Sequence, residues 1–180
     1  KYPDIFLKYL MLKMLGSASE ELILEYREYL DNEGKGLTKE QRTEFYSDLY
    51  NYLNLRIADG DTQFREPLLN LYKHLDLGNL LYDRGAGKIH LYTYKQIFDT
   101  AINLADTEWA EYFAGKYSGA IDDENRKNIV NLEYAKLYCL KNDLKAARIS
   151  LAKVDYRDFI HYLDSKMFLL SIEYDCGNYD

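Results

Sequence analysis

The chain has 180 residues, of which 47% are apolar, and its 23 lysines and arginines against 30 aspartates and glutamates give a formal net charge of −7. This apolar content can form a sizeable core, which excludes a disordered chain, and the length fits one domain or a segment of a larger protein. The negative charge and the lack of a long basic run argue against a dedicated nucleic-acid binder and against an anionic membrane surface as the main target.

Helix start and stop signals recur along the whole chain. Ser17 with Glu20, and then Thr38 with Gln41, have the spacing of a capping box at a helix N-terminus. No stretch alternates apolar and polar residues between hairpin turns, so we predict no strands. The predicted helices span about residues 3–15, 18–32, 39–58, 63–76, 90–104, 107–117, 124–141, 143–154 and 156–174.

Three further features bear on organisation and compartment. Residues 77–89 contain three glycines and are expected to form a loop or joint. The most apolar stretch, residues 5–15, is shorter than the roughly 20 residues that cross a bilayer, so we expect no membrane insertion. Two cysteines, Cys139 and Cys176, cannot form a disulfide framework, and we predict a cytoplasmic protein. Both ends are expected to be cut from a longer chain.

Tyrosine occurs 19 times, against seven phenylalanines and one tryptophan. A tyrosine ring provides a large contact area, but its hydroxyl needs water or a hydrogen-bond partner. We therefore expect many half-buried surfaces, as between stacked layers of helices. An internal repeat agrees with such layers, because Trp109, Leu144 and Tyr179 follow one another at intervals of 35 residues, each just after a polar turn.

A set of residues in the second half of the chain has a characteristic spacing. These residues are Tyr134, Ala135, Tyr138, Asn142, Asp143, Leu144, Ala147 and Leu151. They resemble one tetratricopeptide repeat, in which a large residue beside a small one lets the first helix approach its partner and an alanine marks the crossing in the second helix. The unit has Asn142 where glycine is usual and lacks a proline after Val154. The whole chain is also similar to large uncharacterised bacterial proteins with degenerate repeats of this kind.

The resemblance implies an all-α fold, an α-solenoid of about nine or ten helices in antiparallel pairs wound into a right-handed superhelix. It implies degenerate pairs over residues 1–83 and tetratricopeptide-like repeats, truncated at the C-terminus, over residues 84–180, in one continuous solenoid. Each pair leaves one apolar face uncovered, and the next pair must stack on it.

Motifs for catalysis, cofactors or metals are not found. His74, His90 and His161 are on different predicted helices or edges, without the spacing of metal ligands. The segment 85–88, Gly-Ala-Gly-Lys, lacks the serine or threonine and the preceding strand of a phosphate-binding loop and is expected to be a plain loop. Neither cysteine has a base beside it that would make it a nucleophile. We predict no catalytic, cofactor-binding or metal-binding residues and no cofactor.

The resemblance implies a concave groove as the candidate binding surface. Its wall would be lined by first-helix residues, namely Ala101, Lys136, Cys139, Ser171 and Tyr174. Grooves of this family that grip a peptide carboxylate use several Lys, Arg and Asn side chains, and only Lys136 is available here, so carboxylate clamping is not expected. The alternative, which motif matches of this weakness favour, is that these five residues merely face solvent or pack between repeats.

We therefore predict a non-catalytic protein–protein interaction scaffold with a protein or peptide partner. The alternatives are a nucleic-acid-binding helical repeat, which the charge of −7 disfavours, a helical regulatory domain of an enzyme whose catalytic part lies outside this chain, and self-association.

Overall fold

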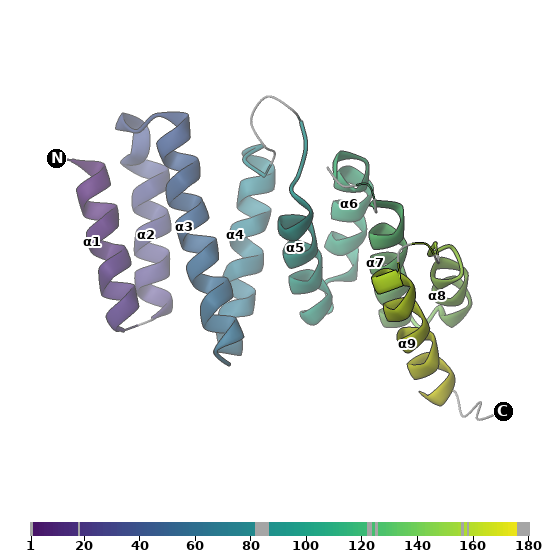
Figure 1. Cartoon of the computed structure of the whole chain (residues 1–180). Helices are drawn as coiled ribbons and strands as arrows, with labels where there is room; N and C mark the ends of the chain where they lie inside the picture. Colours follow the sequence, from purple (N-terminus) through teal and green to yellow (C-terminus); the bar gives the residue numbers. More distant parts are fainter. Residues whose placement is uncertain are drawn as a thin grey trace. The chain divides into compact units, whose positions relative to one another are not determined.

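The computed structural model describes residues 2–17, 19–81, 87–121, 124, 126–155, 157 and 159–175. Within these residues there are nine α-helices and three short 3-10 turns, and there is no strand beyond an isolated bridge between Ile89 and Ile121. The predicted all-α class is confirmed. The chain divides into two compact units, Lys1–Leu80 and Leu81–Asp180 (Figure 1). This division falls in the segment expected to be a joint, three residues before the predicted boundary.

The first unit contains four α-helices that pack in chain order, each against the next. They are α1 (Pro3–Gly16), α2 (Glu20–Asn32), α3 (Lys39–Ala58) and α4 (Arg65–Leu77). The buried side chains of α3 form one wide stripe rather than the two separate faces that the sequence suggested. They are Phe45, Tyr46, Leu49, Tyr52 and Leu53.

Local hydrogen bonds determine where these helices begin. At α3 the predicted capping box is confirmed, because the Gln41 amide donates to Thr38 Oγ1 at 3.2 Å and the Thr38 amide donates to Gln41 Oε1 at 2.9 Å. The predicted box of Ser17 with Glu20 is wrong. Ser17 is still tied to α1, since its amide donates to the Lys13 carbonyl, and α2 is capped instead by the hydroxyl of Ser19.

Several tyrosines are core residues of the first unit rather than half-buried ones. Tyr26 and Tyr52 are at most 6% exposed, and their hydroxyls donate to main-chain carbonyls of neighbouring helices, Phe45 at 3.2 Å and Met14 at 2.7 Å. The expectation of half-buried tyrosines is wrong at these positions. A buried hydroxyl is acceptable there because a main-chain carbonyl oxygen of another helix accepts its hydrogen bond.

The second unit contains five α-helices: α5 (Leu91–Asn103), α6 (Thr107–Tyr117), α7 (Arg126–Leu140), α8 (Leu144–Leu151) and α9 (Phe159–Asp175). The helix α7 contacts both α5 and α9, while α6 packs against α5 and α7, and α8 packs against α7 and α9. The short α6 and α8 therefore each contact two of the longer helices. This places α7 at the centre of the unit.

The two helix pairs α5–α6 and α7–α8 share one turn geometry. Ala105 and Asn142 have left-handed backbones, with φ of 55° and 58°. The following amides, of Asp106 and Asp143, donate to carbonyls five residues earlier at 3.0 and 2.8 Å, as in a Schellman motif. Each aspartate carboxylate then caps the next helix by accepting from the amide three residues on.

The equivalent turn residues are 37 residues apart, so the predicted interval of 35 is wrong at the turns. The starts of α5 and α7 are 35 residues apart, but α7 has 15 residues and α5 has 13. A shift that aligns the starts of these helices therefore misaligns their ends. With the observed spacing, the buried positions of α6 (Ala110, Phe113, Ala114, Tyr117) match those following the second turn (Ala147, Ser150, Leu151, Val154).

Candidate functional site

The five predicted groove residues lie in different environments. Ala101 is fully buried, so the prediction that it lines an open wall is wrong. Cys139 is half-buried and packs against the apolar cluster shared by α7, α8 and α9. Only Ser171 and Tyr174, both on α9, are exposed. Cys176, the second cysteine, lies outside the described residues.

Lys136 is held by two carboxylates. Its ammonium donates to Asp99 Oδ1 on α5 at 2.7 Å and to Glu133 Oε1 on its own helix at 3.1 Å. It lies 3.0 Å from Glu133 Oε2, although that oxygen accepts no well-directed hydrogen bond among the described residues. Burial by itself lowers the pKa of Lys136, but Glu133 and Asp99 outweigh it and raise that pKa. The charge of Lys136 is thus already neutralised from both sides.

Glu133 is a buried carboxylate in this cluster, with 2% of its side chain exposed. Burial raises its pKa to about 7, and the nearby Lys136 limits the rise. The buried hydroxyl of Tyr94 has no hydrogen-bond partner among the described residues, and burial and Glu133 raise the pKa of that phenol. The cluster joins α5 to α7 through the contacts of Lys136 with Asp99 and Glu133, and the Glu133 carboxylate is buried.

A second polar cluster, missed by the sequence analysis, lies in the first unit. The hydroxyl of Tyr46 donates to Asp31 Oδ1, and His74 Nε2 lies 3.1 Å from the same oxygen and 3.3 Å from the Tyr46 hydroxyl. Burial and Asp31 raise the pKa of Tyr46 to about 12. These residues come from α2, α3 and α4, so no spacing in the sequence brings them together.

Asp31 and His74 also line a surface pocket of about 710 Å³. The rest of its wall consists of Leu37, Lys39, Arg42, Leu77, Gly78 and Leu80. Among the described residues that line this pocket there is no Ser, Thr or Cys side chain, and the hydroxyl nearest the imidazole, that of Tyr46, donates to Asp31. The hydrogen bonds of the Asp31, Tyr46 and His74 cluster join three helices, and we assign this cluster a structural role.

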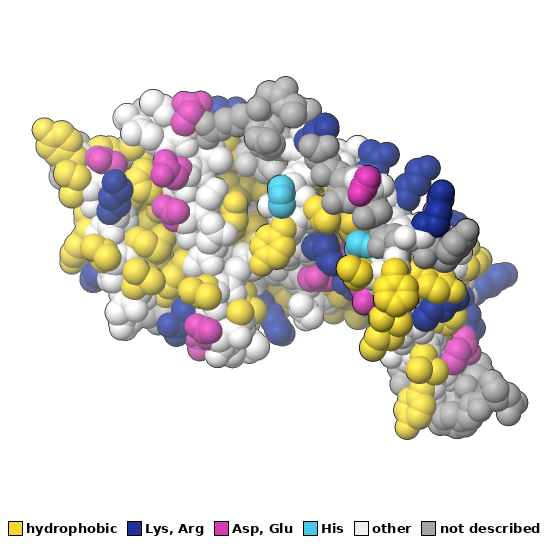
Figure 2. Space-filling model, viewed as in Figure 1, with side chains coloured by type: hydrophobic (Ala, Val, Ile, Leu, Met, Phe, Trp, Pro, Cys, Tyr) yellow, Lys and Arg dark blue, Asp and Glu magenta, His cyan; other side chains and the backbone are white. Residues whose placement is uncertain are grey.

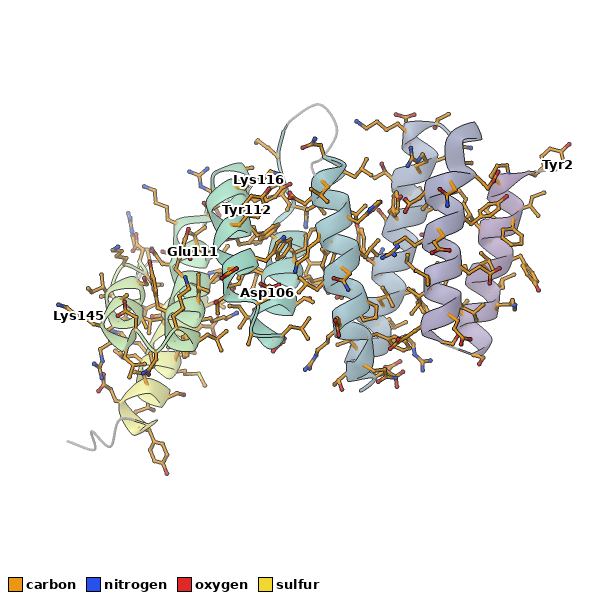
Figure 3. The ribbon with its side chains drawn as sticks, turned by 180° about the vertical axis from the view of Figure 1, so that it is seen from behind. Tyr2, Asp106, Glu111, Tyr112, Lys116 and Lys145 are labelled. Atoms are coloured by element: carbon orange, nitrogen blue, oxygen red, sulfur yellow. The ribbon has the colours of Figure 1, made fainter. Side chains whose placement is uncertain are left out.

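The first and last helices carry exposed rows of large apolar side chains (Figure 2). On α1 the row is Ile5, Tyr9 and Leu12, which are 61, 52 and 68% exposed. Tyr2, just before the helix, is also exposed and points outward (Figure 3). On α9 the row is Ile160, Leu163, Met167, Leu170 and Tyr174, each between 47 and 70% exposed. We call these the α1 row and the α9 row.

The spacing within both rows alternates between three and four residues, which is the spacing of the contact stripe in a pair of packed helices. The opposite side of α9 is covered, because Ile172 joins the buried cluster of α7 and α8. Helices that are apolar on both sides ordinarily lie between two neighbours. The two rows are therefore the candidate functional surfaces of the chain.

Two kinds of site are absent from the part of the chain that the structure describes. No three His, Cys, Asp or Glu side chains are grouped so as to hold a metal ion. None of the described helices has both the length and the apolar character that a membrane crossing needs. Comparisons with models of known protein families, with curated proteins and with solved structures find no match for this chain.

Proposed function

We propose that this chain is a non-catalytic protein–protein interaction scaffold that binds helical segments of a protein or peptide partner along the α1 and α9 rows. The observation that carries the proposal is the exposure of these rows. Monomeric proteins seldom leave contiguous apolar patches in water. A partner that covers these two rows removes their apolar side chains from water, which lowers the free energy of the complex.

The internal packing of the second unit supports an α-solenoid as the framework of this scaffold. Its two helix pairs share one turn geometry, and α7 contacts both α5 and α9. Rigid helix pairs of this kind hold surface side chains in fixed positions, so a partner pays little entropy for ordering them. The α9 row includes Tyr174, one of the predicted groove residues. Lys136, another of them, forms ion pairs inside the second unit.

The partner that fits such a row is an amphipathic helix. Its apolar side chains would recur at intervals of three and four residues and would lie against Leu163, Met167 and Leu170. The ring of Tyr174 and the thioether of Met167 add large or adaptable contact surfaces at low entropic cost.

The test is capture of partners by the whole protein, with substitutions that leave the fold intact. Leu163→Glu and Leu170→Glu place a charge in the α9 row, and Leu55→Glu, on α3, is the matched control because Leu55 is 59% exposed and outside both rows. We expect both α9 variants to lose the same specific partner while the control keeps it. Slower hydrogen exchange of α9 amides in the complex, with unchanged α3 amides, would locate the contact. A partner retained by both α9 variants would contradict the proposal.

A further inference from the structure

We propose that the surface pocket of the first unit binds a small organic anion in which a single carboxylate is joined to an apolar group. The pocket has a volume of about 710 Å³, and the described residues that line it lie between Asp31 and Leu80, on α2, α3, α4 and the turns beside them. It is formed within one unit and is separate from the α1 and α9 rows. Binding there is independent of the proposed scaffold function, so either can fail without the other.

Arg42 lines this pocket with a charge that no carboxylate of the described residues neutralises. Its side chain is half-buried, and it forms no ion pair with any of them. Its Nε–H is buried and has no acceptor among them either. The guanidinium lies near the hydroxyl of Tyr46, an uncharged group that donates to Asp31. Removing a guanidinium from water is costly without an anion beside it, and its planar set of N–H donors matches the two oxygens of a carboxylate.

The other charged groups of the wall leave one positive charge in excess. Lys39 lies three residues before Arg42 on α3, which is the same side of the helix. Asp31 is the one carboxylate among the described lining residues. Its Oδ1 already accepts from the Tyr46 hydroxyl and lies 3.1 Å from His74 Nε2. With the imidazole counted as neutral, two cations face one carboxylate, so a ligand with one negative charge balances the wall. A phosphate group, with a charge of roughly −1.5 to −2, exceeds this balance.

The remainder of the wall is apolar and consists of Leu37, Leu77, Gly78 and Leu80. The turn that ends α4 fixes this part of the wall. Asn79 has a left-handed backbone with φ of 51°, and the Leu80 amide donates to the Leu75 carbonyl at 2.9 Å, as in a Schellman motif. The Leu77 side chain is 84% exposed. An apolar wall beside an unpaired cation suits a ligand that has both an acid group and a hydrocarbon part.

Arg65, on α4, provides a comparison within the same unit. It is also half-buried, and its Nε–H also lacks an acceptor among the residues that the structure describes. It does not line this pocket. An Nε–H without an acceptor is therefore not a site by itself. At Arg42 it coincides with a pocket, a second cation and an apolar wall, and this coincidence is what points to a ligand.

The experiment is an NMR titration of the whole nitrogen-labelled chain with octanoate. The Nε–H signal of Arg42, identified by its loss in Arg42→Gln, reports on the pocket itself. We expect this signal and the amides of residues 77–80 to shift in a saturable way, with a dissociation constant on the order of 1 mM for a ligand of about ten non-hydrogen atoms. Octanamide lacks the charge and acetate lacks the hydrocarbon chain, so each should bind at least about fivefold more weakly.

Substitutions then test the residues. Arg42→Gln should weaken octanoate binding about tenfold, as expected for the loss of charge-assisted hydrogen bonds. Arg65→Gln is the matched control, because it removes the same charge from a half-buried position of the same unit, and it should bind octanoate as the wild type does.

A second variant keeps the proposal testable if circular dichroism shows that Arg42→Gln does not fold. Leu77→Asp adds a carboxylate at a position that is 84% exposed, so the fold should persist. Repulsion between the two carboxylates should weaken octanoate binding about fivefold relative to Leu77→Asn, which has the same shape without the charge.

A peptide ligand distinguishes two sources of the carboxylate. Tighter binding of acetylated dileucine with a free carboxylate than of octanoate would indicate the C-terminus of a protein chain, and the reverse would indicate a small organic acid. Three results would overturn the proposal: no saturable shift with either acid, equal binding of the acids and their amides, or wild-type affinity in folded Arg42→Gln. Tighter binding of inorganic phosphate than of either acid would also overturn it, because the charge balance of the wall would then be wrong.

Discussion

At the scale of single residues, Glu133 is an ionisable group in a buried environment that disfavours its charged form. Its carboxylate is buried, and burial raises its pKa from 4.5 to about 7 while Lys136 limits that rise. The folded protein therefore binds a proton at Glu133 more tightly than the unfolded chain does. Protonation of Glu133 therefore stabilises the folded protein. This stabilisation is fully present below pH 4.5 and is lost as the pH rises through 7.

Replacement of Glu133 by glutamine removes this dependence, since the amide can still accept from Lys136 but never ionises. We expect the free energy of unfolding of Glu133→Gln, relative to the wild type, to rise by on the order of 2 kcal/mol between pH 4.5 and 8. Urea unfolding over this pH range measures it. Glu108→Gln, at an exposed position of α6, is the control. Parallel pH profiles for the wild type and Glu133→Gln would contradict the assignment.

Lys136 shows why the interior of a helical unit is hard to predict residue by residue. The sequence places it on the first helix of a repeat, where a groove residue is expected. In the structure its ammonium reaches Asp99, 37 residues earlier. A substitution of Lys136 would leave Glu133 buried without its cation, so it would change stability as well as any binding.

At the scale of elements, the shared turns explain how helix pairs close in the second unit. Ala105 and Asn142 occupy the left-handed position, with φ of 55° and 58°. Asparagine adopts this conformation with little strain, whereas alanine does not, because its Cβ approaches the neighbouring carbonyl. Ala105 is therefore a strained residue at the end of α5.

Glycine at this position should relieve the strain. We expect Ala105→Gly to raise the free energy of unfolding by about 0.5–1 kcal/mol, the relief of strain exceeding the extra entropy of the unfolded chain. Ala146→Gly, within the helix α8, is the matched control and should lower stability. Thermal and urea unfolding of both variants measure the difference. A loss of stability in Ala105→Gly would mean that the left-handed turn is absent in solution.

At the scale of the whole molecule, each unit has its own core. Residues such as Leu53 and Tyr72 fill the first unit, and residues such as Phe98 and Phe113 fill the second. The single tryptophan of the chain, Trp109, belongs to the second unit and stacks on Phe113, with ring centroids 5.2 Å apart. Its fluorescence therefore reports on one unit, whereas circular dichroism reports on the helices of both.

Two units that each have a core of their own can unfold in separate transitions. We expect urea transitions followed by Trp109 fluorescence and by circular dichroism to differ in midpoint. Leu53→Ala leaves a cavity in the first unit and should lower the free energy of unfolding of that unit by about 2–4 kcal/mol. We expect it to shift the circular dichroism transition while the fluorescence midpoint stays unchanged. If the two signals coincide and shift together in this variant, the units unfold as a single cooperative body.

The sequence by itself determined the all-α class and most helix bounds. These features depend on contacts within a few residues, such as the capping box of Thr38 with Gln41 or the turn at Asn142, and such contacts are visible as spacing. The wrong assignment of Ser17 as a cap was of this local kind, since two serines compete for one helix start.

Only the tertiary structure decided which of the candidate binding residues are exposed at the surface. Periodicity marks the α9 row as apolar, but it does not tell whether another helix covers that row. In the same way, nothing in the sequence shows that Ala101 is buried or that Asp31 meets His74. Burial and ion pairing depend on contacts between helices that are far apart in the chain. The packing energy of such helices is the sum of many weak contacts, so no short spacing in the sequence reveals it.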